Sequence, residues 1–123
     1  MKVYLDNAAT TPLDPEVISV MSKSMKEDYG NPSSSHSFGR SSRSVIETSR
    51  RTIANLLNAD TSEIFFTSSG TEADNMAIRG AVRDAGIKHI VTSKIEHPAV
   101  LNTVAHLLRK NKVTVDYVNI NAL

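Results

Sequence analysis

The chain has 123 residues, of which 40% are hydrophobic and 22% charged, and its formal net charge is +1. This composition is typical of a globular protein with one core, and the small net charge gives no electrostatic reason to expect nucleic acid or an anionic membrane as partner. The absence of cysteine excludes disulfides, thiol nucleophiles and thiolate metal ligands on this polypeptide. No metal site, membrane span or signal peptide is expected, and a cytoplasmic location is the default expectation.

The first half of the chain is predicted to form two helices, each preceded by a polar loop. The first loop covers residues 6–12, and a helix then starts at Asp14-Pro15, where the proline suits a first turn. The second loop covers residues 31–37, and its helix runs from about Phe38 to Leu57. The apolar stripes expected to be buried are Val17, Ile18, Met21 and Met25 in the first helix and Val45, Ile46, Ser49, Ile53, Leu56 and Leu57 in the second.

The second half alternates strand and helix. Strands are predicted at residues 63–67, 89–92 and 113–118, with helices over about 71–85 and from Pro98 onward. From residue 63 onward, this order predicts a parallel sheet with helical crossovers and hence an α/β fold. The length of 123 residues is enough for one domain, and residues 1–123 are expected to belong to one. The residues expected to face inward are Ala73, Ala77, Ile78, Ala81 and Val82 in the first of these helices and Val100, Leu101, Val104 and Leu108 in the second.

Small hydroxyl residues and Gly70 separate the strand predicted at 63–67 from the next helix. The free N–H groups and the positive dipole end of such a helix form an anion site, and Gly70 lets an anion approach the backbone closely. We therefore predict that this turn binds a phosphate. The alternative is a capping box, in which Ser69 caps the helix and Glu72 reaches back. The pattern is neither a P-loop nor a dinucleotide fingerprint.

A second candidate is His97, between Glu96 and Pro98 and just after the strand predicted at 89–92. Ligands of parallel sheets gather beyond the carboxyl ends of the strands, so Thr71 and His97 could meet around one small ligand. Taken alone, His97 is better explained as a cap of the helix that begins at Pro98.

Four segments together resemble the cysteine desulfurases of the class V aminotransferase group: residues 4–12 (YLDNAATTP), 30–36 (GNPSSSH), 66–75 (FTSSGTEADN) and 96–100 (EHPAV). The resemblance implies pyridoxal 5′-phosphate (PLP) as cofactor and the three-layer α/β large domain of fold-type I enzymes. It also implies L-cysteine as substrate, alanine and an enzyme persulfide as products, a homodimer, and a sulfur-acceptor protein in iron–sulfur cluster assembly or tRNA thiolation.

The resemblance also implies roles for the residues of this chain that match the family's motifs. Gly70 and Thr71 would bind the cofactor phosphate, and His97 would stack on the pyridine ring and help to move protons. Asn7 and His36, in the two polar loops, would lie near the mouth of the site. No lysine of this chain lies in the family's Schiff-base motif and there is no cysteine, so the chain is expected to be the front part of a longer enzyme and inactive alone.

Other interpretations remain open. A class V aminotransferase or a selenocysteine lyase would have the same phosphate site, and a non-catalytic interaction module would need no site at all. An interrupted parallel sheet leaves an open edge and apolar surface, so the isolated chain is expected to be a marginal monomer that associates through that surface.

Overall fold

A computed structural model describes residues 1–120, and these residues form two compact units. The N-terminal unit is Met1–Ile64 and the C-terminal unit begins at Phe65. The expectation that the two units belong to one domain stays a prediction. Among the residues described, no helix is both long and apolar enough to cross a lipid bilayer.

The N-terminal unit contains α1 (Pro15–Glu27), α2 (Ser37–Leu57) and the short 3₁₀ helix η1 (Thr61–Glu63). Asp14 caps α1, because its carboxylate accepts a hydrogen bond from the Glu16 N–H at 2.8 Å, and Pro15 occupies the first turn. At the C-terminal end of α2, Asn58 adopts the left-handed conformation (φ 51°) that ends many helices. Both helices lie where the sequence predicts them.

The loop between α1 and α2 packs tightly against the start of α2. A Cβ atom added at Gly39 would lie 2.5 Å from the Asn31 carbonyl oxygen and 2.6 Å from that of Ser34, so only glycine fits. Two side chains of α2 also bind this region: Ser42 Oγ donates to the Asp28 carbonyl at 2.8 Å and Arg43 Nε to the Pro32 carbonyl at 2.8 Å. The polar loop is therefore a fixed part of the unit.

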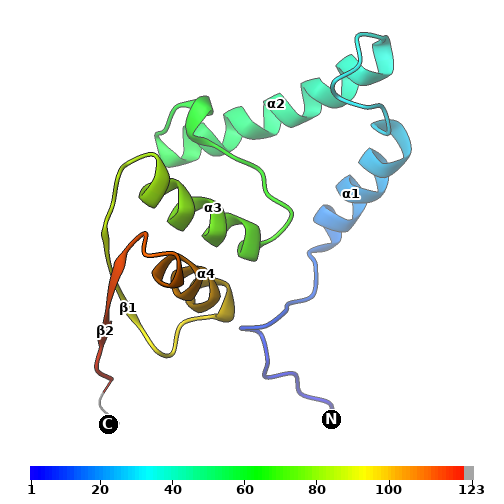
Figure 1. Cartoon of the computed structure of the whole chain (residues 1–123). Helices are drawn as coiled ribbons and strands as arrows, with labels where there is room; N and C mark the ends of the chain where they lie inside the picture. Colours follow the sequence, from blue (N-terminus) through cyan, green and yellow to red (C-terminus); the bar gives the residue numbers. More distant parts are fainter. Residues whose placement is uncertain (121–123) are drawn as a thin grey trace. The chain divides into compact units, whose positions relative to one another are not determined.

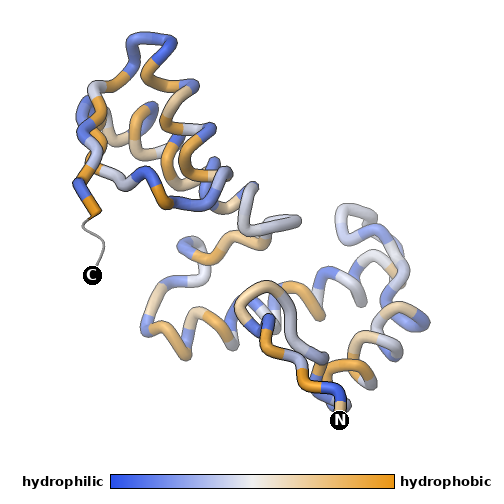
Figure 2. Tube along the Cα trace, turned by 90° about the horizontal axis from the view of Figure 1, so that it is seen from below, coloured by the Kyte–Doolittle hydropathy of each residue, from blue (hydrophilic) through white to orange (hydrophobic). Residues whose placement is uncertain are grey.

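The apolar stripes of α1 and α2 are not buried, contrary to expectation. No residue of α1 is buried, and α2 buries only Gly39, Ser42 and Ala54. Hydrophobic residues recur along both helices in Figure 2, yet Leu56 remains 81% exposed. The helical period was predicted correctly, but burial requires a partner surface, and the N-terminal unit by itself provides too little of one.

The strand predicted at residues 63–67 is also wrong. Thr61–Glu63 forms η1 instead, because Asp60 and Glu63 make a reciprocal capping box: the Asp60 carboxylate accepts from the Ser62 N–H and the Glu63 carboxylate from the Asp60 N–H. Residues 64–67 form neither helix nor strand, and Phe65 and Phe66 are exposed. The two-stranded sheet formed within residues 1–120 does not include them.

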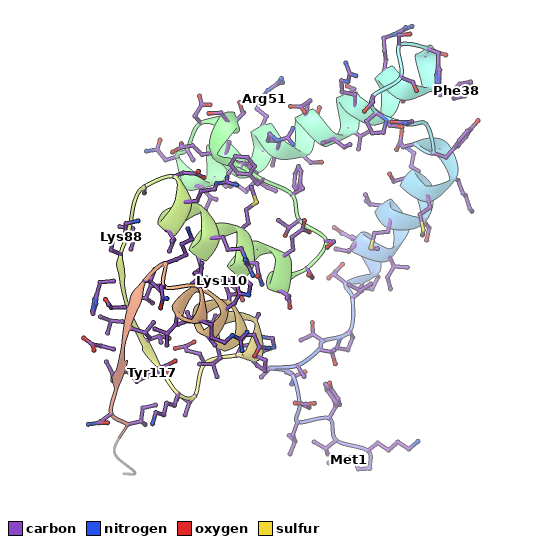
Figure 3. The ribbon with its side chains drawn as sticks, in the orientation of Figure 1. Met1, Phe38, Arg51, Lys88, Lys110 and Tyr117 are labelled. Carbon is purple, nitrogen blue, oxygen red and sulfur yellow. The ribbon has the colours of Figure 1, made fainter. Side chains whose placement is uncertain are left out.

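The C-terminal unit has the order α3 (Gly70–Arg83), β1 (His89–Ser93), α4 (Pro98–Arg109) and β2 (Thr114–Val118). β1 and β2 pair in parallel, with His89 opposite Thr114 and Ser93 opposite Val118. Figure 3 marks the two ends of this sheet, with Lys88 just before β1 and Tyr117 near the end of β2. The strands predicted at residues 89–92 and 113–118, the helical crossover and the α/β class are confirmed.

α3 and α4 lie on the same side of β1 and β2 (Figure 1), and the core forms between these layers. Its buried residues are Val82, Leu107 and Val113, with Ile78, Ile90 and Val115 packed against them. The expected inward alanines of α3 are exposed, whereas Val82 is buried and Ile78 half-buried as expected. On the opposite face of the sheet Val91 is 61% exposed, so the third layer of the expected three-layer arrangement is not formed by the described residues.

The chain leaves an unusually large surface open, 10049 Å². A compact monomer of 13.4 kDa exposes about 6,500 Å², and two separate compact units of half that mass would together expose about 7,800 Å². This exposed surface is larger than separation into two compact units would give by itself. It reflects apolar helix and sheet faces that lack a covering layer.

Candidate functional site

At the first turn of α3, some backbone N–H groups are bound by capping side chains and others are open. Ser69 is the N-cap, and its hydroxyl accepts a hydrogen bond from the Glu72 N–H at 3.3 Å. The Glu72 carboxylate accepts from the Ser68 N–H at 2.6 Å and from the Ser68 hydroxyl at 2.7 Å. The predicted capping arrangement is thus present, although Glu72 reaches Ser68 rather than Ser69.

The N–H groups of Gly70 and Thr71 remain open, since no acceptor within residues 1–120 meets them. They lie at the positive end of the α3 dipole, where an anion is favoured. A Cβ atom added at Gly70 would meet no atom within 4 Å, so the space beside the Cα atom of Gly70 is open. The turn can therefore accept an anion without losing its cap.

The hydrogen bonds from Ser68 lower the pKa of Glu72 below its ordinary value, the backbone N–H contributing more than the hydroxyl. The hydrogen bonds therefore keep the carboxylate ionised to a lower pH than an ordinary glutamate. Its negative charge lies on the Ser68 side of the turn and already compensates part of the helix dipole.

His97 caps α4. Its backbone is extended (φ −57°, ψ 144°), Pro98 begins the helix, and the imidazole Nδ1 accepts a hydrogen bond from the Ala99 N–H at 3.1 Å. Because Nδ1 accepts, this bond assigns the neutral ring proton to Nε2. The capping interpretation of His97 is therefore confirmed, and it leaves Nε2 and the ring for a second role.

Thr71 and His97 line one pocket, of about 360 Å³, between α3 and α4. This size falls at the lower end of the range of about 300–1,000 Å³ that is common for small-molecule sites. Gly70 is not among the residues that line it. The lining residues are Thr71, Asn75 and Arg79 from α3 and His97, Pro98, Ala99, Asn102, Thr103, His106 and Arg109 at and along α4.

Several of these residues were not predicted from the sequence. Thr71, Asn75 and Arg79 follow one another at four-residue spacing, so they share one face of α3, and this regularity could have identified the set. Arg79 and Arg109 bring positive charge to the pocket, and Arg79 Nε donates to Asn75 Oδ1 at 3.1 Å. A negatively charged ligand is the type that such a lining favours.

Asn7 and His36 belong to the N-terminal unit. Asn7 lies in a turn in which the Ala9 and Thr10 N–H groups donate to the Asp6 carbonyl at 3.1 and 3.3 Å. His36 caps α2, its Nδ1 accepting from the Gly39 N–H at 3.2 Å. Their place at the mouth of the site stays a prediction.

The family assignment rests on a match over nearly the whole chain. The profile described as "Aminotransferase class-V" matches residues 3–123. The chain belongs to this family. A curated class-V relative, the cysteine desulfurase of Trichormus azollae, is 49% identical over 120 residues, which are 97% of this chain and 30% of that protein. The chain thus spans about 30% of the length of that relative.

Solved structures agree with this class-V assignment. A "NifS-like protein" superposes with a TM-score of 0.85 at 38% identity, covering 98% of this chain and 33% of the other. A structure described as "SspA in complex with cysteine" has a TM-score of 0.76 at 34% identity, covering 90% of this chain and 32% of the other. The resemblance to cysteine desulfurases seen in the four sequence segments is confirmed.

The first turn of α3 and the neighbouring pocket together fit part of a PLP site. Open N–H groups at Gly70 and Thr71, together with the Thr71 hydroxyl, suit a phosphate, and the His97 imidazole is a flat group that can face an aromatic ring. Lysine, which would be needed to bond the cofactor covalently, is absent from the lining. The arrangement therefore fits the phosphate end and one ring face of the cofactor.

Proposed function

We propose that this chain provides the phosphate-binding turn and the ring-facing imidazole of a PLP-dependent cysteine desulfurase, which removes sulfur from L-cysteine and leaves alanine and an enzyme persulfide. The observation that carries the proposal is that Thr71 and His97 line one pocket, with the N–H groups of Gly70 and Thr71 open. Family membership and a curated cysteine desulfurase at 49% identity support the choice of reaction.

In this proposal the chain's own residues bind the phosphate, orient the ring of the cofactor and move a proton. Gly70 and Thr71 hold the phosphate through charge-assisted hydrogen bonds, which are about twice as strong as neutral ones. His97 faces the ring and moves a proton at Nε2, since its Nδ1 is engaged by the Ala99 N–H. When bound, the cofactor supplies electron withdrawal from the substrate carbon.

The sulfur-accepting thiol cannot come from these residues, because the sequence contains no cysteine. We infer that a different stretch of polypeptide provides this thiol and the lysine that holds the cofactor. A homodimer, and a sulfur-acceptor protein of iron–sulfur cluster assembly or tRNA thiolation, complete the proposal. The purified chain, given PLP and cysteine, is expected to release no sulfide, and sulfide release would contradict this division of roles.

The phosphate assignment is tested by NMR titration of the chain with pyridoxine 5′-phosphate. This compound lacks the aldehyde of PLP and so cannot react with surface lysines. The amides of Gly70 and Thr71 are expected to shift on binding, and Thr71→Ala is expected to weaken binding by about 1–3 kcal/mol, or roughly fivefold to 150-fold.

Thr52→Ala is the matched control. Thr52 lies in α2 and its hydroxyl donates to the Thr48 carbonyl at 3.0 Å within the same helix. This variant is expected to bind as the unsubstituted chain does. If Thr71→Ala and Thr52→Ala bind equally well, the phosphate does not lie at the first turn of α3.

A further inference from the structure

We propose that Asn75 is a positioning residue that, through Thr103, fixes the Thr71 end of the pocket relative to the His97 end. The inference rests on the proposed function, because it concerns the same pocket. Asn75 Nδ2 donates to the Thr71 carbonyl at 2.9 Å, and Asn75 Oδ1 accepts from the Thr103 hydroxyl at 2.7 Å. One side chain thus connects the first turn of α3 to α4.

The orientation of the Asn75 amide is determined by its neighbours. Arg79 Nε, 3.1 Å away, can only donate a hydrogen bond, so the amide atom that faces it must be the oxygen. The NH₂ group therefore points to the Thr71 carbonyl. The three hydrogen bonds of Asn75 are mutually consistent, which restricts its side chain to this orientation.

Burial makes the Thr103 contact costly to lose. Thr103 is 2% exposed and its neighbour Val104 1% exposed, so the Thr103 hydroxyl has no ready access to water. A buried hydroxyl without a partner is unfavourable, and Asn75 Oδ1 is the partner it finds. Breaking this hydrogen bond would therefore leave the Thr103 hydroxyl buried without a partner.

This hydrogen bond is the only one that joins the described residues of α3 and α4. Apolar contacts bring two helices together but tolerate small sliding movements, whereas a short hydrogen bond is directional and fixes their register. Thr71 lies one turn before Asn75, and His97 caps the helix that carries Thr103. A shift between the two helices would thus change the separation of the phosphate-binding turn and the imidazole.

The test compares Thr103→Val with Thr103→Ser. Valine keeps the shape and loses the hydroxyl, whereas serine keeps the hydroxyl. Two ligands report on different parts of the pocket: inorganic phosphate needs the turn at Thr71 alone, and pyridoxine 5′-phosphate spans the distance to His97.

Thr103→Val is expected to weaken binding of pyridoxine 5′-phosphate about fivefold to tenfold and to change the affinity for inorganic phosphate less than about twofold. Thr103→Ser is expected to restore both affinities. Equal losses for the two ligands, or no loss for either, would overturn the positioning role while leaving the phosphate site intact.

Failure of the proposed function has a different signature, namely that the unsubstituted chain binds neither ligand. The positioning role is then decided by NMR on the unliganded chain. Thr103→Val is expected to shift both the Thr71 amide and the His97 imidazole resonances, and Thr103→Ser neither. Shifts confined to α4 would overturn the link to Thr71.

Discussion

Replacing His97 by asparagine separates the two roles of this residue. Asparagine is among the best N-cap residues, and its side-chain oxygen can accept the hydrogen bond that His97 Nδ1 now accepts from the Ala99 N–H at 3.1 Å. It has no ring, however, to face a pyridine. His97→Ala removes the cap and the ring together, so the pair of variants isolates each contribution.

The expected magnitudes differ between the two variants. Loss of an N-cap costs about 0.5–2 kcal/mol, and a domain near this size loses about 4 °C in Tm per kcal/mol, so His97→Ala should unfold about 2–8 °C lower. His97→Asn should stay within about 2 °C of the unsubstituted chain. Since an aromatic contact is worth about 0.5–1.5 kcal/mol, both variants should bind pyridoxine 5′-phosphate roughly twofold to 13-fold more weakly.

Thermal unfolding followed by circular dichroism gives the stability, and NMR titration gives the affinity. Inorganic phosphate is the control ligand, whose affinity should not change with His97→Asn because it does not reach the ring. If His97→Asn binds pyridoxine 5′-phosphate as tightly as the unsubstituted chain, the imidazole is a cap and nothing more, and the proposed site loses one of its two ends.

Three further outcomes are expected. Gly39→Ala should destabilise the chain by about 1–3 kcal/mol in urea unfolding, because the new Cβ would lie 2.5 Å from a carbonyl oxygen. Gly70→Ala is the control and should not destabilise the chain, because its new Cβ meets no atom within 4 Å. Equal effects of the two substitutions would contradict the tight packing of the loop before α2. The pKa of Glu72 is lowered in the folded chain, so its stabilisation is complete above the ordinary value of 4.5 and is lost as the pH falls through the lowered value. Glu72→Gln should therefore reduce the acid-induced loss of stability between pH 6 and pH 3, and an unchanged profile would refute the role of the cap. Light scattering should give a mass above 13.4 kDa that rises with concentration, since so much apolar surface is open; a stable monomer would refute this.

Features set by neighbouring residues in the sequence were predictable. Asp14, Ser69 and His97 cap helices because a short acceptor followed by a helical pattern satisfies the first N–H groups locally. The parallel pairing of β1 with β2 followed from the strand–helix–strand order. In each case the physical cause lies within a few residues, or in a connection that allows one topology.

Features that depend on distant surfaces were not predictable. The stripes of α1 and α2 have the helical period but remain exposed, because periodicity tells which face can be buried and not whether a partner covers it. Residues 63–67 have strand-like composition, yet Glu63 ends the 3₁₀ helix η1 and residues 64–67 form no strand. The role of Asn75 depends on the packing of α3 against α4, which no local pattern encodes.

The proximity of Thr71 and His97 was predicted correctly, but from a sheet arrangement that the described residues do not form. The prediction placed both residues at the carboxyl edge of a sheet containing two strands that end there, but the first of these strands is absent from the described residues. The two residues line one pocket because α3 packs directly against α4. The separation of Thr71 and His97 therefore depends on how α3 packs against α4. The hydrogen bond between Asn75 and Thr103 joins these two helices and so affects that separation.

Capping and ligand binding were treated as competing explanations of the sequence, but the geometry makes them compatible. In α3, Glu72 uses the Ser68 N–H and Ser69 uses the Glu72 N–H, which leaves the donors of Gly70 and Thr71 open. A residue that caps a helix uses one polar atom for the capping hydrogen bond, and its other atoms remain available to a ligand. The imidazole of His97 follows the same rule: the cap occupies one nitrogen, and the second nitrogen and the ring remain for a ligand. Evidence for a cap is thus no evidence against a site, and the two must be separated by substitutions that preserve one and remove the other.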